Sequence, residues 1–232
     1  MTPVKIKDVF IFPFTETEDI IKLCSDNKKL YLSINAEIII NARGEIAEII
    51  NQNVGYADGA GAVKALKKKG FEDVIRIPGC ELWLQLVEKY YKEKSFYLIG
   101  STEQTINDTV EKLRRSYPNI NLVGYRNGYI QSDKDRNKLI EDVSQKKPDF
   151  VFVATGFPMQ EFLMNDLYHV HKAVYLNLGG SFDVYTGKVT RAPRLIQKNG
   201  FEWFYRFITH PSRYKRQIVY IKFLWLYLMN KL

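Results

Sequence analysis

Residues 149–156 are Asp149-Phe150-Val151-Phe152-Val153-Ala154-Thr155-Gly156, and this stretch sets the class of fold. A short run of β-branched and aromatic residues, bounded by an acid and by a Thr-Gly pair, predicts a strand buried on both faces. Residues 157–169 follow it and predict a loop and a helix. A buried strand that leads into a helix is the repeating unit of a parallel sheet.

The same alternation extends along the chain in both directions. Further strands are predicted at 30–34, 53–57, 95–99, 121–124 and 173–178, and helices at 61–69, 82–91, 102–117 and 133–146. We also expect one short strand within residues 1–14, a helix opened by a Thr15–Glu18 capping box, one helix from Asn35 to about Ile50, and an extended segment at 73–77. Alternating strands and helices predict an α/β fold, with a mostly parallel sheet and helices on both faces.

Polar and glycine residues gather where the predicted strands end. They are Asn35, Asp58-Gly59, Gly100-Ser101, Gly156 with Gln160, and Gly179-Gly180. Ligands of parallel sheets bind at the carboxyl ends of the strands. Five such clusters at strand ends predict a ligand site at this edge.

Each cluster also has a plain structural interpretation. Asp58-Gly59 is an ordinary turn dipeptide, although a strand-end carboxylate also suits a general base. Gly100-Ser101 fits a tight turn as well as a contact to phosphate or ribose. Gln160 and Glu161 fall in the first turn of a helix opened by Pro158 and are expected to face the crevice, whereas Glu161 alone also favours the helix dipole.

The last 46 residues differ from the rest of the chain in charge. Residues 187–232 carry ten basic side chains and one acidic one, a net charge of +9, against −1 for the remainder. The segment ends in the apolar run 218–229, which is 12 residues long and contains Lys222. A bilayer span needs about 20 apolar residues, so this tail predicts a basic, amphipathic helical appendage that lies on an anionic membrane surface without crossing it.

Several classes of protein fit the sequence less well. Two cysteines, Cys24 and Cys80, favour a reduced, cytosolic protein, and Lys5, Lys7 and Asp8 argue against a signal peptide. No cysteine and histidine cluster has metal-ligand spacing, and the three histidines are interpreted as structural. A nicotinamide enzyme would need three fingerprint glycines and a later acid. A nucleic-acid binder would interleave its aromatic and basic residues, whereas here the aromatic residues lie toward the apolar end.

Taken together, the motifs resemble those of the WecG/TagA/CpsF family, glycosyltransferase family 26. The matching stretches are Asn35-Ala36-Glu37, Tyr56-Ala57-Asp58-Gly59, Arg76-Ile77-Pro78-Gly79 with Leu82-Trp83, Gly156-Phe157-Pro158-Met159-Gln160-Glu161, Gly179 to Gly187, Arg191-Ala192-Pro193, Gly200 to Arg206, and Pro211-Ser212-Arg213 with Arg216. They run in family order from about residue 30 to 220. Met159 departs from the pattern, because many relatives carry Lys there.

The resemblance implies an inverting transferase with a Rossmann-like catalytic domain, expected at 1–190, and the appendage at 191–232. It implies a UDP-sugar donor, an undecaprenyl-diphosphate-linked N-acetylglucosamine acceptor, and neither metal nor cofactor. The expected donors are UDP-N-acetylmannosaminuronic acid, which the Tyr-Ala-Asp-Gly and Leu-Trp motifs favour, or UDP-N-acetylmannosamine. UDP-glucose or another UDP-hexose remains an alternative. The expected location is the cytoplasm, peripheral on the inner face of the cell membrane.

The resemblance also assigns roles to residues. Asp58 would be the general base, Arg213 and Arg216 with Arg206 would stabilise the leaving UDP, and Gln160 would position a substrate. The other residues expected to bind substrate are Ser33, Asn35, Gly59, Arg76, Gly100, Ser101, Gly156, Glu161, Gly179, Gly180, Asp183 and Arg191. We expect no nucleic-acid partner. A homo-oligomer that buries the apolar tail, and a non-catalytic scaffold recruited to membranes, stay open.

Overall fold

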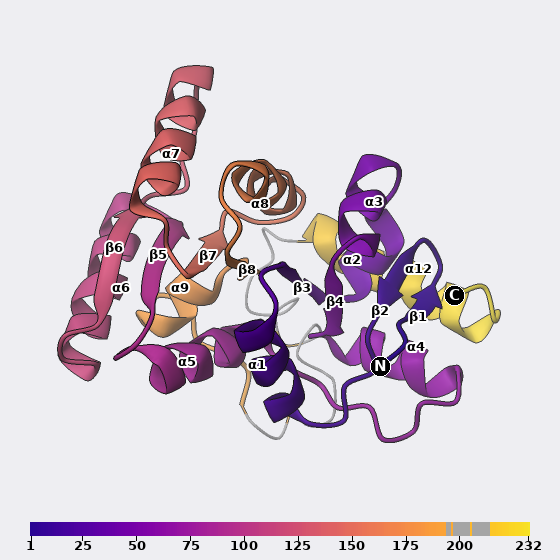
Figure 1. Ribbon diagram of the computed structural model, residues 1–232. Helices are drawn as coiled ribbons and strands as arrows, with labels where there is room; N and C mark the ends of the chain where they lie inside the picture. The colour runs from indigo at the N-terminus through magenta and orange to yellow at the C-terminus, as the bar shows by residue number, and fades with distance from the viewer. Residues whose placement is uncertain (194–195, 197–204, 206–213) are drawn as a thin grey trace. The chain divides into compact units, whose positions relative to one another are not determined.

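The structure is a computed structural model that describes residues 1–193, 196, 205 and 214–232 (Figure 1). Its centre is a six-stranded sheet in the order β4-β3-β8-β7-β5-β6. The strands are β3 (Leu30–Ile34), β4 (Val54–Ala57), β5 (Ser95–Gly100), β6 (Asn121–Arg126), β7 (Phe150–Ala154) and β8 (Val174–Asn177). β8, β7, β5 and β6 run parallel to their neighbours, and β3 runs parallel to β8. The predicted α/β sheet is confirmed.

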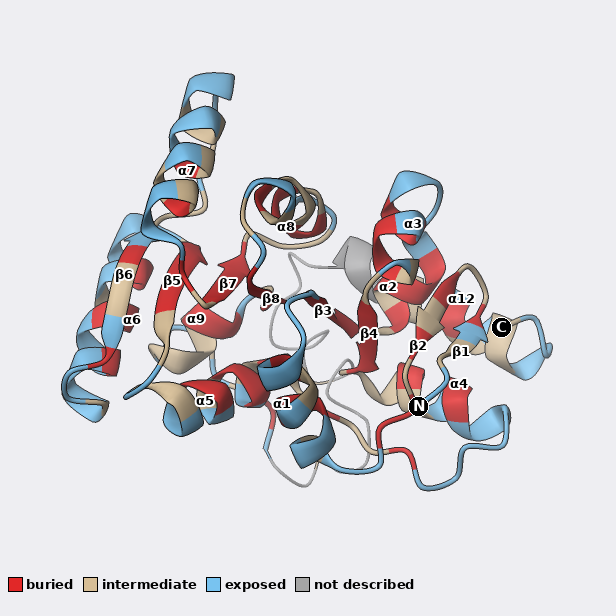
Figure 2. Cartoon of the chain, in the orientation of Figure 1, coloured by how far each residue is buried: buried red, intermediate tan, exposed pale blue. Residues whose placement is uncertain are grey.

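The apolar run that predicts β7 forms the middle of the sheet. All five β7 residues are buried, as Figure 2 shows for the central strands. Phe152 lies in register with Leu98 of β5 and Leu176 of β8. The Phe152 ring also stacks on Phe96 of β5, with the ring centroids 6.0 Å apart. A strand with apolar residues on both faces can satisfy its backbone only inside a sheet, which places β7 between β5 and β8.

The helices follow the strands as the alternation predicts. They are α1 (Thr17–Asp26), α2 (Ala36–Asn41), α3 (Glu45–Asn51), α4 (Ala60–Lys68), α5 (Gly79–Tyr90), α6 (Glu103–Ser116), α7 (Asp133–Lys146), α8 (Met159–Val170), α9 (Ser181–Tyr185) and α12 (Tyr214–Leu228). The start of α6 shows how local sequence sets a helix boundary. Thr102 is the N-cap, and its side-chain oxygen accepts from the Thr105 amide at 3.2 Å. Its apolar residues Ile106, Val110 and Leu113 are buried as their spacing predicts.

The chain divides into two compact units. Unit 1 contains Met1–Glu16, Ser33–Pro78 and Thr190–Leu232, and unit 2 contains Thr17–Leu32 and Gly79–Val189. The predicted catalytic domain at 1–190 and appendage at 191–232 stay a prediction. That residues 1–16 and 33–78 group with the tail in unit 1 was not predicted from the sequence.

Two predictions within unit 1 were wrong. The single strand expected in residues 1–14 is a hairpin of β1 (Val4–Ile6) and β2 (Val9–Ile11), which turns at Lys7 with a left-handed φ of 58°. The single helix expected up to Ile50 is two helices, α2 and α3. Ala42 is extended and Gly44 has a left-handed φ of 51°, so no helix continues through them.

The end of the chain forms helix α12, which packs on α2 within unit 1. Phe223 of α12 is 2% exposed, and a Cβ placed on Gly61 would lie 3.2 Å from its ring. The Lys68 amine bonds to the Tyr227 carbonyl and lies 4.3 Å from the centroid of the Tyr227 ring. Among the described residues, no helix is long and apolar enough to cross a membrane. The tail therefore contributes to the packing of unit 1.

Candidate functional site

In unit 1, the structure brings together the residues predicted at the ends of β3 and β4. The Asp58 and Gly59 amides both donate to the Ile34 carbonyl, at 3.0 and 3.3 Å. Asn35 caps α2 by accepting from the Ile38 amide at 3.1 Å. A Cβ on Gly59 would lie 3.0 Å from the Asn35 Cβ, so the close approach of the two strand ends requires a residue without a side chain.

Arg76 joins the same cluster from the segment that precedes α5. Its Nε donates to the Asp58 carbonyl oxygen at 2.6 Å, and the next amide, that of Ile77, donates to Ala57 at 2.8 Å. Ser33 is also in this unit and is 8% exposed. Unit 1 thus places an acid, an amide and a guanidinium at two adjacent strand ends.

In unit 2, Gln160 joins the loops that follow β7 and β8. Its Oε1 accepts from the Gly156 amide at 3.2 Å and from the Gly179 amide at 3.0 Å. Its Nε2 donates to Glu161 Oε1 at 2.9 Å, and Asn177 Nδ2 donates to the same oxygen at 2.7 Å. Sequence analysis expected Gln160 and Glu161 to face a crevice. Both are buried and hold neighbouring groups, because polar side chains inside a protein need hydrogen-bond partners.

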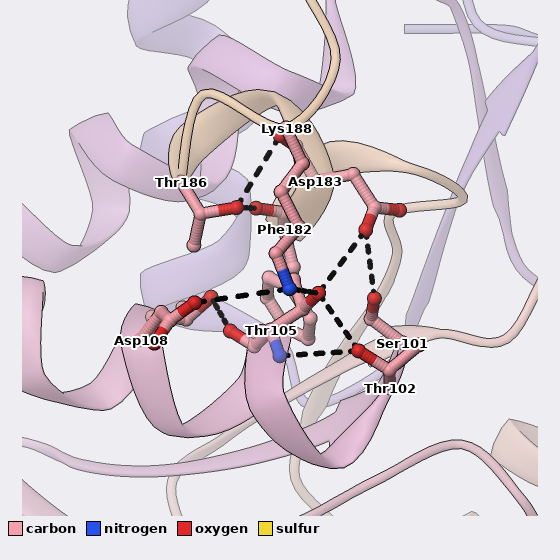
Figure 3. Close-up of polar contacts among 9 residues, drawn as sticks. Ser101, Thr102, Thr105, Asp108, Phe182, Asp183, Thr186 and Lys188 are labelled. Atoms are coloured by element: carbon pink, nitrogen blue, oxygen red, sulfur yellow. Dashed lines mark hydrogen bonds and ion pairs between the residues drawn. The ribbon is translucent and has the colours of Figure 1, made fainter.

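A second polar cluster in unit 2 lies where β5 leads into α6 (Figure 3). Asp183 Oδ1 accepts from the Ser101 hydroxyl at 2.8 Å and from the Thr105 hydroxyl at 3.5 Å. Lys188 donates to the Thr105 hydroxyl at 2.7 Å and lies 3.7 Å from Asp108 Oδ2. Ser101, with a left-handed φ of 56°, is thereby tied to the start of α9.

The glycines at these strand ends serve two different purposes. Gly100 has a φ of 146°, and a Cβ there would lie 2.5 Å from the Ala154 carbonyl oxygen. The pairing of β5 with β7 therefore leaves no room for a side chain at this position. Gly179 has a φ of 54°, and a Cβ there would meet nothing within 4 Å. Beside it, a Cβ on Gly180 would meet only Asp183 Oδ2, at 3.9 Å. Open space beside a carboxylate oxygen suits a ligand that carries hydroxyl groups.

Most arginine side chains of the tail lie outside the residues that the structure describes. Arg206 and Arg213 lie outside the described residues, and Arg216 belongs to α12 with only its backbone described. Arg191 is described and is partly exposed. The predicted role of these guanidinium groups stays a prediction.

Other candidate groups have structural partners. His169 Nδ1 lies 2.7 Å from the Asn165 carbonyl oxygen, and His171 Nε2 lies 2.8 Å from the Pro148 carbonyl oxygen. Burial raises the pKa of the Cys24 thiol above its usual range. Within the described part of the chain, no three His, Cys, Asp or Glu residues gather as metal ligands would.

Sequence analysis did not single out Asn177, Thr105, Asp108 or Lys188 as site residues. Asn177 had a usable signal, because a polar residue that closes an apolar strand just before Gly179 points toward the strand-end site. Thr105, Asp108 and Lys188 had none, because their meeting depends on how α6 packs beside α9.

In a comparison of the sequence with models of protein families, the model described as the glycosyl transferase WecG/TagA/CpsF family matches residues 8–232. This range contains all of unit 2, unit 1 except its first seven residues, and both sets of candidate residues.

Proposed function

The chain belongs to the WecG/TagA/CpsF family of glycosyltransferases, and we propose that it transfers a sugar from a UDP-sugar to N-acetylglucosamine carried on a polyprenyl diphosphate. Membership by itself establishes a glycosyltransferase of cell-surface polysaccharide synthesis. The proposed donor is UDP-N-acetylmannosaminuronic acid or UDP-N-acetylmannosamine, and another UDP-hexose is the alternative.

The observation that carries the proposal for the donor is the polar edge of unit 2. Ser101, Gly156 and Gly179 follow β5, β7 and β8, three adjacent strands of one sheet. Such an edge is where α/β proteins bind nucleotides. Asp183 Oδ2 beside Gly180 is an acceptor for a hydroxyl of the ribose or of the sugar.

The proposed chemistry is a single displacement at the anomeric carbon. Asp58 accepts the proton of the acceptor hydroxyl as its oxygen attacks, and UDP leaves with the electrons of the broken bond. The contact from Arg76 to the Asp58 carbonyl supports this by fixing the backbone that carries the carboxylate. Arg213 and Arg216 with Arg206 are proposed to stabilise the charge on the departing diphosphate.

Contact with a membrane surface is proposed for the outer face of α12. Ile218, Ile221, Trp225 and Leu228 are each more than half exposed and recur at helical spacing, while Phe223 packs inward. Lys222 and Lys231 are exposed near this stripe. Aromatic and aliphatic side chains with lysines between them suit the interface of an anionic leaflet.

This surface can be tested without disturbing the fold. Ile221→Glu combined with Trp225→Glu is expected to abolish sedimentation of the full chain with vesicles that contain anionic lipid, while its thermal unfolding stays as in the wild type. The control is Val170→Glu, since Val170 is an exposed apolar residue of α8. Equal sedimentation of the double variant and the wild type would contradict the assignment of this face.

The reaction itself is tested by measuring UDP release with a synthetic polyprenyl-diphosphate N-acetylglucosamine acceptor. The donor panel contains UDP-N-acetylmannosamine, its uronic acid, UDP-N-acetylglucosamine and UDP-glucose. Release that depends on the acceptor and favours one of the first two donors is expected. No release with any donor, from folded protein with vesicles present, would contradict the proposal, and calorimetry with UDP would then separate another acceptor from a non-catalytic scaffold.

A further inference from the structure

Three polar side chains are buried together where β7 and β8 end. Gln160 is 3% exposed, and Glu161 and Asn177 are fully buried. All three lie in unit 2, two at the start of α8 and one at the last position of β8. Burying three polar side chains costs free energy unless each is bonded, and an apolar core would avoid that cost. Their presence at strand ends calls for a reason besides packing.

The bonds of this cluster fix the orientation of both amides. Glu161 Oε1 accepts from Gln160 Nε2 and from Asn177 Nδ2. Because that oxygen accepts both bonds, each amide must turn its NH₂ group toward it. The Gln160 oxygen then points the other way, toward the amides of Gly156 and Gly179. The bonds therefore run in sequence from Asn177 through Glu161 and Gln160 to two backbone amides.

The two glycines at the end of this series adopt backbone conformations that other residues rarely adopt. Gly156 has a φ of 87° and Gly179 a φ of 54°, in a region that glycine enters at no steric cost. Their loops follow adjacent strands, and the Gly179–Gly180 loop borders the open space beside Asp183. A single acceptor oxygen shared by both amides holds the two loops in a fixed relation.

We propose that Asn177 is a positioning residue for the donor site: it acts through Glu161 and Gln160 to hold the Gly156 and Gly179 loops in the conformation that receives the nucleotide. The part that concerns the nucleotide rests on the proposed function. The bracing of the loops does not. Glu161 and Asn177 are fully buried, so this role is argued from their bonds to Gln160 and needs no contact between either residue and the substrate.

The first test uses amide hydrogen exchange on the full chain without any ligand. In Asn177→Ala and in Gln160→Ala, exchange at the Gly156 and Gly179 amides is expected to accelerate by roughly tenfold, the effect of losing about one hydrogen bond to a charged or buried partner. The matched control is Asn107→Ala, because Asn107 Nδ2 also donates to a carboxylate, that of Glu103 at 3.4 Å, on the exposed surface of α6. Unchanged exchange at both glycines would overturn the proposal.

The second test asks whether the residues act as one unit. UDP affinity by calorimetry is expected to fall roughly tenfold in Asn177→Ala and in Gln160→Ala. The double variant should bind UDP no more weakly than the weaker-binding of the two single variants, because the effects of residues in one network are not additive. With an active donor, KM should rise while kcat changes little. The positioning role would be overturned if the double variant lost UDP affinity by the product of the two single losses. It would also be overturned if kcat fell while UDP affinity stayed unchanged.

These two tests distinguish failure of the proposed function from failure of the proposed role of Asn177. If the wild type does not bind UDP, the proposed function fails, and amide exchange still decides whether Asn177 braces the loops. If Asn177→Ala does not fold, Asn177→Ser repeats both measurements with a smaller loss of polar volume. Failure of both variants to fold would show that Asn177 serves stability alone and would overturn the proposal.

Discussion

The two units hold their candidate residues by different means. In unit 2, side chains bind side chains: Ser101 and Thr105 to Asp183, and Gln160 and Asn177 to Glu161. In unit 1, main-chain groups take part in the contacts at Asp58: its amide donates to Ile34 and its carbonyl accepts from Arg76. A network of side chains sets the shape of a pocket in advance. The turn that follows β4 instead fixes the backbone position of Asp58, which carries the carboxylate. Both observations support the proposals already made, that the polar edge of unit 2 receives the nucleotide and that Asp58 acts as the general base.

The units differ also in their titratable groups. In unit 2, burial is the chief cause that raises the pKa values of one thiol and five phenols: Cys24, Tyr31, Tyr97, Tyr117, Tyr175 and Tyr185. In the described part of unit 1, burial and the nearby Arg43 lower the pKa of the Lys7 amine. The raised pKa values in unit 2 make its stability sensitive to alkaline pH.

The largest expected effect on stability falls on unit 1. Phe223→Ala removes a fully packed aromatic ring between α12, α2 and Gly61, and should cost about 3–5 kcal/mol of unfolding free energy. Amide exchange should rise in α2 and α4 while β5 and β7 keep their protection. The control is Phe71→Ala, whose ring is 39% exposed. Unchanged denaturant stability in Phe223→Ala would show that the tail helix is not part of the packing of unit 1.

Alkaline pH should act on unit 2. The unfolded chain ionises Cys24 and Tyr175 near their usual pKa values of 9.0 and 10.0, whereas the fold keeps both protonated to higher pH. Their contribution to stability is thus complete below pH 9 and is lost as pH rises toward the raised values, by about 1.4 kcal/mol per pH unit and group. Urea unfolding at pH 8 and 10.5 measures this loss. Tyr175→Phe should reduce the loss of stability between these pH values by the share of this one phenol, and Tyr129→Phe, at an exposed position, should leave it as in the wild type. An equal pH dependence in both variants would refute this origin.

The smallest expected effect is on the Ser101 contact. Ser101→Ala removes one hydrogen bond to Asp183, so UDP affinity should fall roughly two- to tenfold, with little change in stability. Calorimetry of the full chain measures this, and Ser25→Ala, at an exposed position of α1, is its control. If Ser101→Ala lost more free energy of unfolding than free energy of UDP binding, the role of Ser101 would be in the fold alone.

The sequence predicted those features that depend on local patterns. The apolar run of β7 and the spacing of Ile106, Val110 and Leu113 in α6 are properties of single segments, and both predictions are confirmed. The hairpin at Lys7 was missed because a non-glycine residue takes the left-handed conformation there. The break at Gly44 was missed because the residues on both sides favour helix.

For the candidate site, the sequence located the strand ends and not the bonds between them. Gln160 and Glu161 were found through their motif, but Gly179, the partner of Gln160, and Asn177, the partner of Glu161, lie 19 and 16 positions further on and meet them only through sheet order. Lys188 was counted as one charge of a basic tail, although it binds Thr105 inside unit 2. Contacts of this kind depend on tertiary packing, which no local pattern encodes.

The most direct test of the account compares turnover and UDP binding in Asp58→Asn. Loss of one general base should lower turnover by roughly 10²–10⁴-fold, while UDP affinity by calorimetry stays as in the wild type, because Asp58 is proposed to act on the acceptor hydroxyl and not on the nucleotide. Asp73→Asn, at an exposed position of unit 1, is the control. Near-normal turnover in Asp58→Asn, or a loss of UDP binding that matches the loss of turnover, would contradict the proposed role of Asp58 as the general base.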